Sequence, residues 1–78
     1  MREFTICLYS VRQILNFVSL ATVQPFDVRV ENDRQQVNGK SFLGMLTMDH
    51  SGGVHVRVDC DAEAFAVFRA EAEKLLTN

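Results

Sequence analysis

The order of apolar and polar residues along the chain first predicts where its strands lie. Apolar and polar side chains alternate at residues 2–8, 26–31 and 54–58. A period of two places alternate side chains on opposite faces of a strand, so each segment is expected to bury one face. The predicted buried set is Phe4, Ile6, Leu8, Phe26, Val28, Val30, Val54, Val56 and Val58. A further strand is expected at residues 35–37, because residues 32–34 favour a hairpin turn.

Three other segments have the spacing of helices, and each follows a residue that can cap a helix. Ser10, Ser41 and Asp61 are the expected caps, because their short side chains accept a hydrogen bond from the first turn. The first helix is predicted to begin at residue 11 and to end before Pro25, which lacks a backbone N–H. Its predicted apolar stripe is Val11, Ile14, Leu15, Val18 and Ala21, widened by Phe17 and Leu20.

The second predicted helix, at residues 42–48, is short and apolar on nearly every side. Its apolar members are Phe42, Leu43, Met45, Leu46 and Met48, with Gly44 weakening the middle. So short a helix cannot direct all of them toward one core, and two or three are expected at the surface. The third helix follows Asp61 and is expected to pack through Phe65, Phe68, Ala72, Leu75 and Leu76.

The resulting order of elements is βαββαβα, in one domain that spans residues 1–78. Each predicted strand has one polar face, which suits a four-stranded antiparallel sheet covered on one face by three helices. The expected fold class is therefore α+β, an open-faced sandwich of two layers. A chain of 78 residues leaves no room for a second domain.

Composition and charge narrow the function mainly by exclusion. Hydrophobic residues make up 47% of the chain and the formal net charge is -2, which predicts a globular core without the basic surface that nucleic acid requires. No apolar stretch is long enough to span a bilayer and no secretory signal begins the sequence. We therefore expect a cytoplasmic protein with neither nucleic acid nor membrane as a partner.

Residues that commonly carry catalysis or bind metals are sparse. Cys7 and Cys60 are expected to remain free thiols, since the sequence has no C-x-x-C motif and no cysteine–histidine cluster with metal-binding spacing. His50 is expected in a polar loop, and His55 on the solvent side of its strand, opposite a carboxylate if opposite anything. Without paired carboxylates or a nucleophile–base pair, we predict no enzymatic activity, no metal and no cofactor.

One segment resembles a known family. Residues 37–48 read Val-Asn-Gly-Lys-Ser-Phe-Leu-Gly-Met-Leu-Thr-Met, which is similar to the regulatory-serine segment of HPr, the histidine-containing phosphocarrier protein of the bacterial sugar phosphotransferase system. Four polar or small residues match that family's pattern, namely Lys40, Ser41, Gly44 and Thr47. The resemblance runs without gaps over residues 17–64, and it implies a fold with the element order deduced above.

The family's phosphate-accepting site is incomplete in this chain. HPr-like sequences contain Asn-Pro-x-Gly-Leu-His-x-Arg-Pro-Ala, and the histidine of that segment accepts phosphate. Counting back along the matched residues places Ser10 at the histidine and Arg12 at the arginine, in a shorter loop. His50 and His55 cannot replace the missing histidine, because one follows the second helix and the other lies in the last strand.

The missing histidine changes the chemistry that the resemblance implies. A relay from phosphoenolpyruvate needs a nitrogen nucleophile whose phosphorylated form stays high in energy, whereas a serine ester would trap the phosphate. Ser10 and Arg12 are therefore predicted to form the remnant of a phosphate- or anion-binding site at a helix start. The plain alternatives are a helix cap for Ser10 and a solvated side chain for Arg12.

The regulatory-serine segment keeps the features that the resemblance ties to control by protein partners. Ser41 stands where a dedicated kinase phosphorylates the family's serine, and added negative charge suits a helix start. The plain alternative is a cap worth about 1 kcal/mol. The predicted partner-binding residues are Lys40, Phe42, Leu43 and Leu46, although Leu46 also fits the core together with Met45.

Three functions stay open at this point. The first is a regulatory module that binds partners of the phosphotransferase and carbon-regulation system, such as a serine kinase or a transcription regulator. The second is a structural domain that self-associates as a homodimer through the exposed helix. The third is a phosphocarrier that uses Ser10 or another group in place of histidine. The resemblance supports the first two, because a catabolite-repression homologue in the family lacks the histidine, keeps the serine and tends to dimerise.

Overall fold

The predicted elements form in the predicted order. The computed structural model describes residues 1–75, so Leu76 of the expected last stripe lies outside the described residues. Its strands are β1 (Arg2–Ile6), β2 (Val28–Glu31), β3 (Gln36–Asn38) and β4 (Val54–Val58). Its helices are α1 (Val11–Thr22), α2 (Phe42–Thr47) and α3 (Ala62–Lys74).

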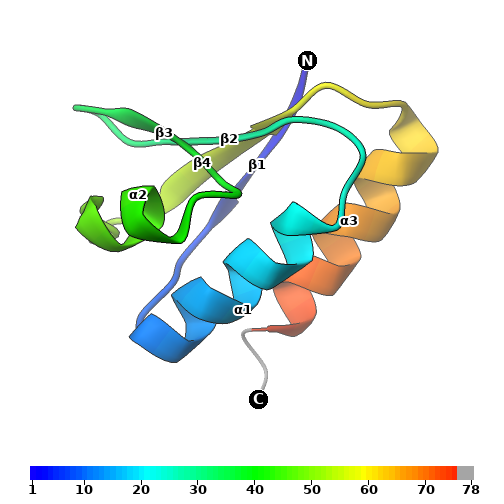
Figure 1. Cartoon of the computed structure of the whole chain (residues 1–78). Coiled ribbons are helices and arrows are strands. Elements are labelled where there is room, and N and C mark those ends of the chain that lie inside the picture. The colour runs from blue at the N-terminus through cyan, green and yellow to red at the C-terminus, as the bar shows by residue number, and fades with distance from the viewer. Residues whose placement is uncertain (76–78) are drawn as a thin grey trace.

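The four strands form one antiparallel sheet in the order β1-β4-β2-β3. Figure 1 shows α1, α2 and α3 on the same face of this sheet. The predicted α+β sandwich of two layers is therefore confirmed. The register places Phe4, Val56 and Val30 in one row across β1, β4 and β2, and all three are buried beneath the helices.

Two strands are shorter than the alternation of apolar residues suggests. β1 ends at Ile6 although Leu8 is buried, and β2 begins at Val28 although Phe26 packs against the core. Both apolar residues lie in the connections between the sheet and α1, where the backbone leaves the strand ladder to reach the helical layer. The apolar pattern reports which side chains are buried and does not report where strand pairing stops.

Each helix begins at its predicted cap. The side chains of Ser10, Ser41 and Asp61 accept hydrogen bonds from the backbone N–H three residues further along, at 3.1, 3.1 and 2.8 Å respectively. Each cap thereby pairs one of the N–H groups that the start of a helix leaves without a partner. α1 ends at Thr22, ahead of Pro25, as predicted.

The buried stripe of α1 differs from the predicted one. Val11 is 61% exposed and Leu15 is 46% exposed, whereas the buried residues of the helix are Ile14, Phe17, Val18 and Ala21. Successive residues of an α-helix are rotated by about 100°, so Leu15 points well away from the direction of Ile14. The prediction that Val11 and Leu15 belong to the core stripe was wrong, and both instead lie at the surface of α1.

The core between the two layers is centred on Phe68 of α3. Its ring centroid lies 5.9 Å from that of Phe4, 6.1 Å from that of Phe17 and 5.6 Å from that of Phe26. Phe65, the other predicted aromatic core residue, is half-buried, with its ring centroid 5.9 Å from that of Phe4. α3 therefore fixes the positions of β1 and α1, and with them the connection that carries Ser10.

A tight approach at Gly39 sets the path from β3 into α2. Its N–H donates to the Val28 carbonyl oxygen at 2.7 Å, and a Cβ at residue 39 would lie 2.6 Å from Val28 Cγ1 and 3.2 Å from the Val28 oxygen. Val28 is buried in the sheet, so it has little room to move. We expect Gly39→Ala to lower the free energy of unfolding by about 1–3 kcal/mol, measured by urea denaturation.

A double-mutant cycle tests the cause of this loss. Val28→Ala removes the methyl group that a residue-39 Cβ would meet, so Gly39→Ala should cost less in that background than in the wild type. Strictly additive losses would show that the contact with the Val28 side chain is not the reason.

Candidate functional site

Ser10 and Arg12 meet in one hollow at the start of α1. The hollow has a volume of about 360 Å³ and is lined by Ser10, Arg12, Gln13, Asn16 and Leu75. Arg12 is exposed and has no hydrogen-bond or ion-pair partner among residues 1–75. The structure thus brings the two predicted anion-binding residues together. Gln13, Asn16 and Leu75 were not predicted as part of this site.

The hydroxyl group of Ser10 acts as a helix cap. Ser10 Oγ accepts from the Gln13 N–H at 3.1 Å, and Gln13 Oε1 accepts from the Tyr9 N–H at 2.7 Å. The backbone N–H groups of Val11 and Arg12 belong to the first turn, which leaves such groups without partners inside the helix. The hollow can therefore attract an anion, but none of the residues that line it within the described part of the chain is a base that would activate the Ser10 hydroxyl.

Neither histidine lies at this hollow. His55 is on β4, opposite Thr5 and Glu31 in the register, with its Nδ1 3.1 Å from Thr5 Oγ1; the predicted solvent side and facing carboxylate are confirmed. His50 lies in the loop after α2 but is half-buried, and its Nε2 donates to the Met45 carbonyl oxygen at 2.6 Å. His50 thus pairs a carbonyl group at the end of α2.

The connection between β1 and α1 pairs two side chains that sequence reasoning did not connect. The Cys7 thiol lies close enough to the Tyr9 hydroxyl to raise the pKa of Tyr9, first through hydrogen bonding and then through its charge, with a smaller contribution from desolvation. Tyr9 is 83% exposed beside Ser10. Cys7 and Cys60 are both free thiols, as expected, and lie at opposite ends of the β1–β4 pair.

Ser41 caps α2, which lies in the same helical layer as α1. Its Oγ accepts from the Gly44 N–H at 3.1 Å and its carbonyl oxygen accepts from the Met45 N–H at 3.0 Å. A Cβ at Gly44 would lie 3.3 Å from the Ser41 Oγ and 3.5 Å from the Val37 Cβ, so the glycine keeps the surroundings of the hydroxyl open. Ser41 is half-buried in this arrangement.

Lys40 links the start of α2 to the end of α1. Its Nζ donates to the Gln24 carbonyl oxygen at 2.9 Å, and its backbone N–H donates to Asn38 Oδ1 at 2.9 Å. The side chain is half-buried, so the ammonium group holds the two helices together in the unbound protein. A contact of Lys40 with a partner stays a prediction.

Three apolar residues of α2 lie at the surface, as the length of the helix predicts. Phe42 is 38% exposed, Leu43 is 73% exposed and Leu46 is 38% exposed, and we call these three residues the α2 surface. Met45 and Met48 are buried, since a helix of six residues turns only one side toward the core. The expectation that Leu46 fits the core was wrong, because Leu46 lies on the solvent-facing side of α2, away from the buried Met45.

The segments that contain α1 and α2 carry basic but no acidic residues. No Asp or Glu occurs in residues 10–26 or 34–48, which contain α1, α2 and the connections leading to them. The same stretches contain Arg12, Arg34 and Lys40, and α1, which packs against α2, exposes Val11 and Leu15. α2 itself thus offers an apolar surface without carboxylates, although Asp49 follows it in the next loop, and such a surface suits a partner surface that is mainly apolar.

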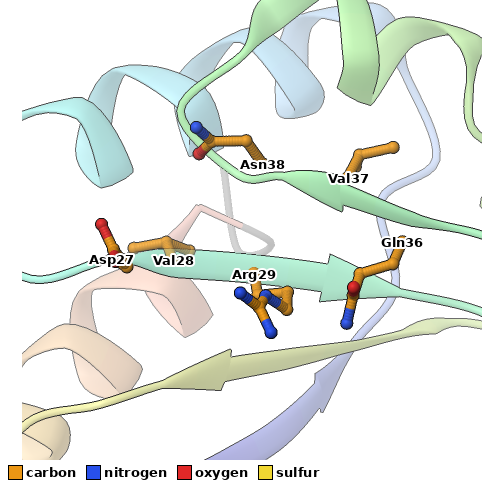
Figure 2. A pocket seen from close by; sticks show the side chains of 6 residues that line it. All are labelled: Asp27, Val28, Arg29, Gln36, Val37 and Asn38. Atoms are coloured by element: carbon orange, nitrogen blue, oxygen red, sulfur yellow. The ribbon is translucent and has the colours of Figure 1, made fainter.

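The open face of the sheet has a hollow of about 310 Å³ over β2 and β3, shown in Figure 2 and lined by Asp27, Val28, Arg29, Gln36, Val37 and Asn38. Arg29 lies opposite Arg57 and Asn38 in the register. Arg57 in turn lies 3.4 Å from a carboxylate oxygen of Glu3 and 3.4 Å from one of Glu31. Acidic and basic groups therefore balance on this face, which offers no one-sided field for a ligand.

The loop after α2 is held by Asp49. Its Oδ1 accepts from the Ser51 hydroxyl at 2.6 Å and from the Ser51 N–H at 2.9 Å, and these two bonds lower the pKa of the carboxyl group. The Asp49 carbonyl oxygen accepts from Asn32 Nδ2 at 2.9 Å, which ties the end of α2 to the β2–β3 hairpin. α2 is thus fixed at both ends.

Within residues 1–75, no helix combines the length and apolar character needed to cross a membrane.

Comparisons with known proteins agree with this geometry. A family model described as the PTS HPr component phosphorylation site matches residues 10–78. No curated protein matched the sequence. Among solved structures, HPr-C-His from Thermoanaerobacter tengcongensis is 25% identical with a TM-score of 0.75, and the match covers 100% of this chain and 98% of that one.

Two further solved structures share the fold at lower identity. The phosphocarrier protein HPr from Bacillus anthracis is 19% identical with a TM-score of 0.67, over 88% of this chain and 93% of its own. The catabolite repression containing protein Crh of Bacillus subtilis is 24% identical with a TM-score of 0.63, over 92% of this chain and 86% of its own. Crh was described as a dimer with a swapped domain.

Proposed function

Because the chain belongs to the HPr family of the phosphotransferase system, we propose that it is a regulatory protein-binding module that does not relay phosphate and has no enzymatic activity of its own. The carrying observation is the α2 surface, where Phe42, Leu43 and Leu46 lie exposed beside Ser41 on a helix that itself contains no carboxylate. The partner is a protein of the phosphotransferase or carbon-regulation system, in the cytoplasm. A serine kinase or a transcription regulator fits this description.

The start of α1 supports the exclusion of a relay. Ser10 stands where the family's histidine is expected, its hydroxyl caps the helix, and no base lines the hollow around it. A phosphoserine ester holds its phosphate too firmly to pass it on, whereas a phosphohistidine does not. Arg12 and the first-turn N–H groups keep only the capacity to attract an anion.

We propose Ser41 as a regulatory phosphorylation site. A phosphate there would add about 1.5 to 2 negative charges at the start of α2, a helix without carboxylates of its own. The positive end of the helix dipole and the unpaired N–H groups favour that charge. Phosphorylation would therefore change the electrostatic character of the α2 surface from weakly basic to acidic, and with it the choice of partner.

Two labelling reactions test this proposal. The protein is incubated with enzyme I and labelled phosphoenolpyruvate, and separately with the HPr serine kinase and labelled ATP. We expect no acid-labile label in the first reaction, and in the second an acid-stable label that Ser41→Ala removes. Ser19→Ala, which changes an exposed serine of α1, is the matched control and should keep the label. An acid-labile phosphoramidate on the wild type would contradict the proposal.

Self-association is the second candidate function. The fold of Crh, described as a swapped dimer, is shared by this chain, and here β1 is an edge strand paired with β4 alone. Sedimentation over a range of concentrations measures the oligomeric state. A dimer that persists in Leu43→Glu but fails to be phosphorylated would favour a structural role through β1. A monomer at all concentrations would exclude it.

A further inference from the structure

A second apolar groove lies away from the α2 surface. It has a volume of about 370 Å³ and separates the α1–β2 connection from the start of α3, two segments that Figure 1 shows side by side. Pro25 and Phe26 line one wall, and Ala64 and Val67 line the other. We call this feature the α3 groove.

The floor of the α3 groove is apolar and rigid. The Phe26 ring is half-buried and packs with its centroid 5.6 Å from that of Phe68, so it is held from below. Val67 is 57% exposed at the groove, and Val23, next to the lining residue Gln24, is 75% exposed. A side chain placed here would remove apolar surface from water without any rearrangement of the core.

The rim of the same groove is acidic. Asp61 and Glu63 line it, and Asp59 precedes them, whereas residues 58–68 contain no Lys or Arg. Asp61 uses one oxygen to cap α3, but Glu63 has no hydrogen-bond or ion-pair partner among residues 1–75. Burial raises the pKa of Cys60, the charge of Asp61 raises it further, and the smaller contributions of Arg2 and Asp59 lower and raise it respectively.

The two cations nearest to this rim, Arg2 and Lys40, make their hydrogen bonds elsewhere. Arg2 donates its Nε to the Cys60 carbonyl oxygen at 3.1 Å, and Lys40 donates its Nζ to the Gln24 carbonyl oxygen at 2.9 Å. These carbonyl oxygens are neutral, so both side chains keep their positive charge, but neither is paired with a carboxylate of the rim among residues 1–75. Glu63 and Val67 are four residues apart on α3, so a charged and an apolar contact point share one helix face.

We propose that the α3 groove binds a segment of a partner protein in which a large apolar side chain stands next to Lys or Arg. The apolar side chain would contact Phe26 and Val67, and the cation would pair with Glu63 and the free oxygen of Asp61. The three residues of the α2 surface carry no charge, whereas the α3 groove has an acidic rim, so the two sites fit different partner segments. The inference does not depend on Ser41 and goes beyond the proposed function.

A peptide titration tests the inference. The ¹⁵N-labelled protein is titrated with the acetylated, amidated peptide KLRLK and, separately, with the matched peptide ELELE. We expect KLRLK to shift the amide resonances of Glu63, Ala64 and Val67, to leave those of Leu43 and Leu46 in place, and to bind more weakly as salt is raised. ELELE should leave the groove resonances in place.

Matched charge reversals identify the contact. Glu63→Lys should weaken KLRLK binding about tenfold, while Glu71→Lys, which makes the same charge change at another exposed position of α3, should have little effect. Val67→Ala, a substitution that α3 tolerates, should also weaken binding. Equal binding of both peptides, equal losses from the two charge reversals, shifts on α2, or a groove occupied by a second copy of this chain would each overturn the inference.

Discussion

Phe68→Ala is expected to lower the free energy of unfolding by about 3–5 kcal/mol. The side chain is 1% exposed, and its ring packs against those of Phe4, Phe17 and Phe26. Its removal would leave a cavity bounded by β1, α1 and the approach to β2, which cannot all close in together. Native domains are stable by about 5–15 kcal/mol, so at the lower end of that range the substitution would remove most of the stability.

Urea denaturation followed by circular dichroism measures this loss. Phe65→Ala is the matched control, because Phe65 is an aromatic residue of the same helix that is half-buried and contacts the ring of Phe4 alone. It should cost clearly less than Phe68→Ala. Equal losses at the two positions would mean that Phe68 is not the centre of the core.

Much of the fold follows from patterns that are local in the sequence. Alternation around Val28 and Val56 predicts strands with one buried face, and both side chains are buried. Ser41 and Asp61 predict helix starts, because a cap needs only a short polar side chain and a free N–H three residues on. Strands with one polar face then require helices on a single side, which the structure confirms.

The misplaced residues are those whose environment depends on distant segments. Val11 and Leu15 match a helical stripe by spacing, but α1 contacts the core through a face centred near Phe17. Leu46 fits a core position equally well by hydropathy alone. Whether such a residue is buried depends on where the neighbouring helix and sheet lie in the folded protein. The spacing of apolar residues in a single sequence does not give those positions.

The candidate sites also differ in whether they depend on residues close together in the sequence or on distant segments. The neighbourhood of Ser10 and Arg12 follows from two residues within one turn of a helix, so the sequence predicts it. The participation of Leu75 in that hollow required the packing of α3 against α1. The α3 groove joins Phe26 to Val67, which are far apart in the chain, and no motif marks either residue as a binding residue.

In and around α2, the residues that stabilise the fold differ from the residues that are available to bind a partner. Met45 and Met48 anchor α2 in the core, and Lys40 ties its start to α1. Phe42 and Leu43 can then remain exposed, since the position of the helix does not depend on their burial. Substitutions at Leu43 should therefore change binding far more than folding.

Leu43→Glu is accordingly expected to reduce kcat/KM for phosphorylation of Ser41 by the HPr serine kinase about thirtyfold, as the loss of an apolar hot spot would. The wild-type residue is 73% exposed, so the unfolding midpoint should stay nearly unchanged. Ala70→Glu places the same charge at an exposed position of α3 and should leave kcat/KM at the wild-type value. The contrary result is that both variants are phosphorylated as fast as the wild type, with Ser41→Ala still not phosphorylated. The kinase would then recognise Ser41 without the α2 surface. In that case the serine remains the modified residue, and the docking role proposed for Phe42, Leu43 and Leu46 fails.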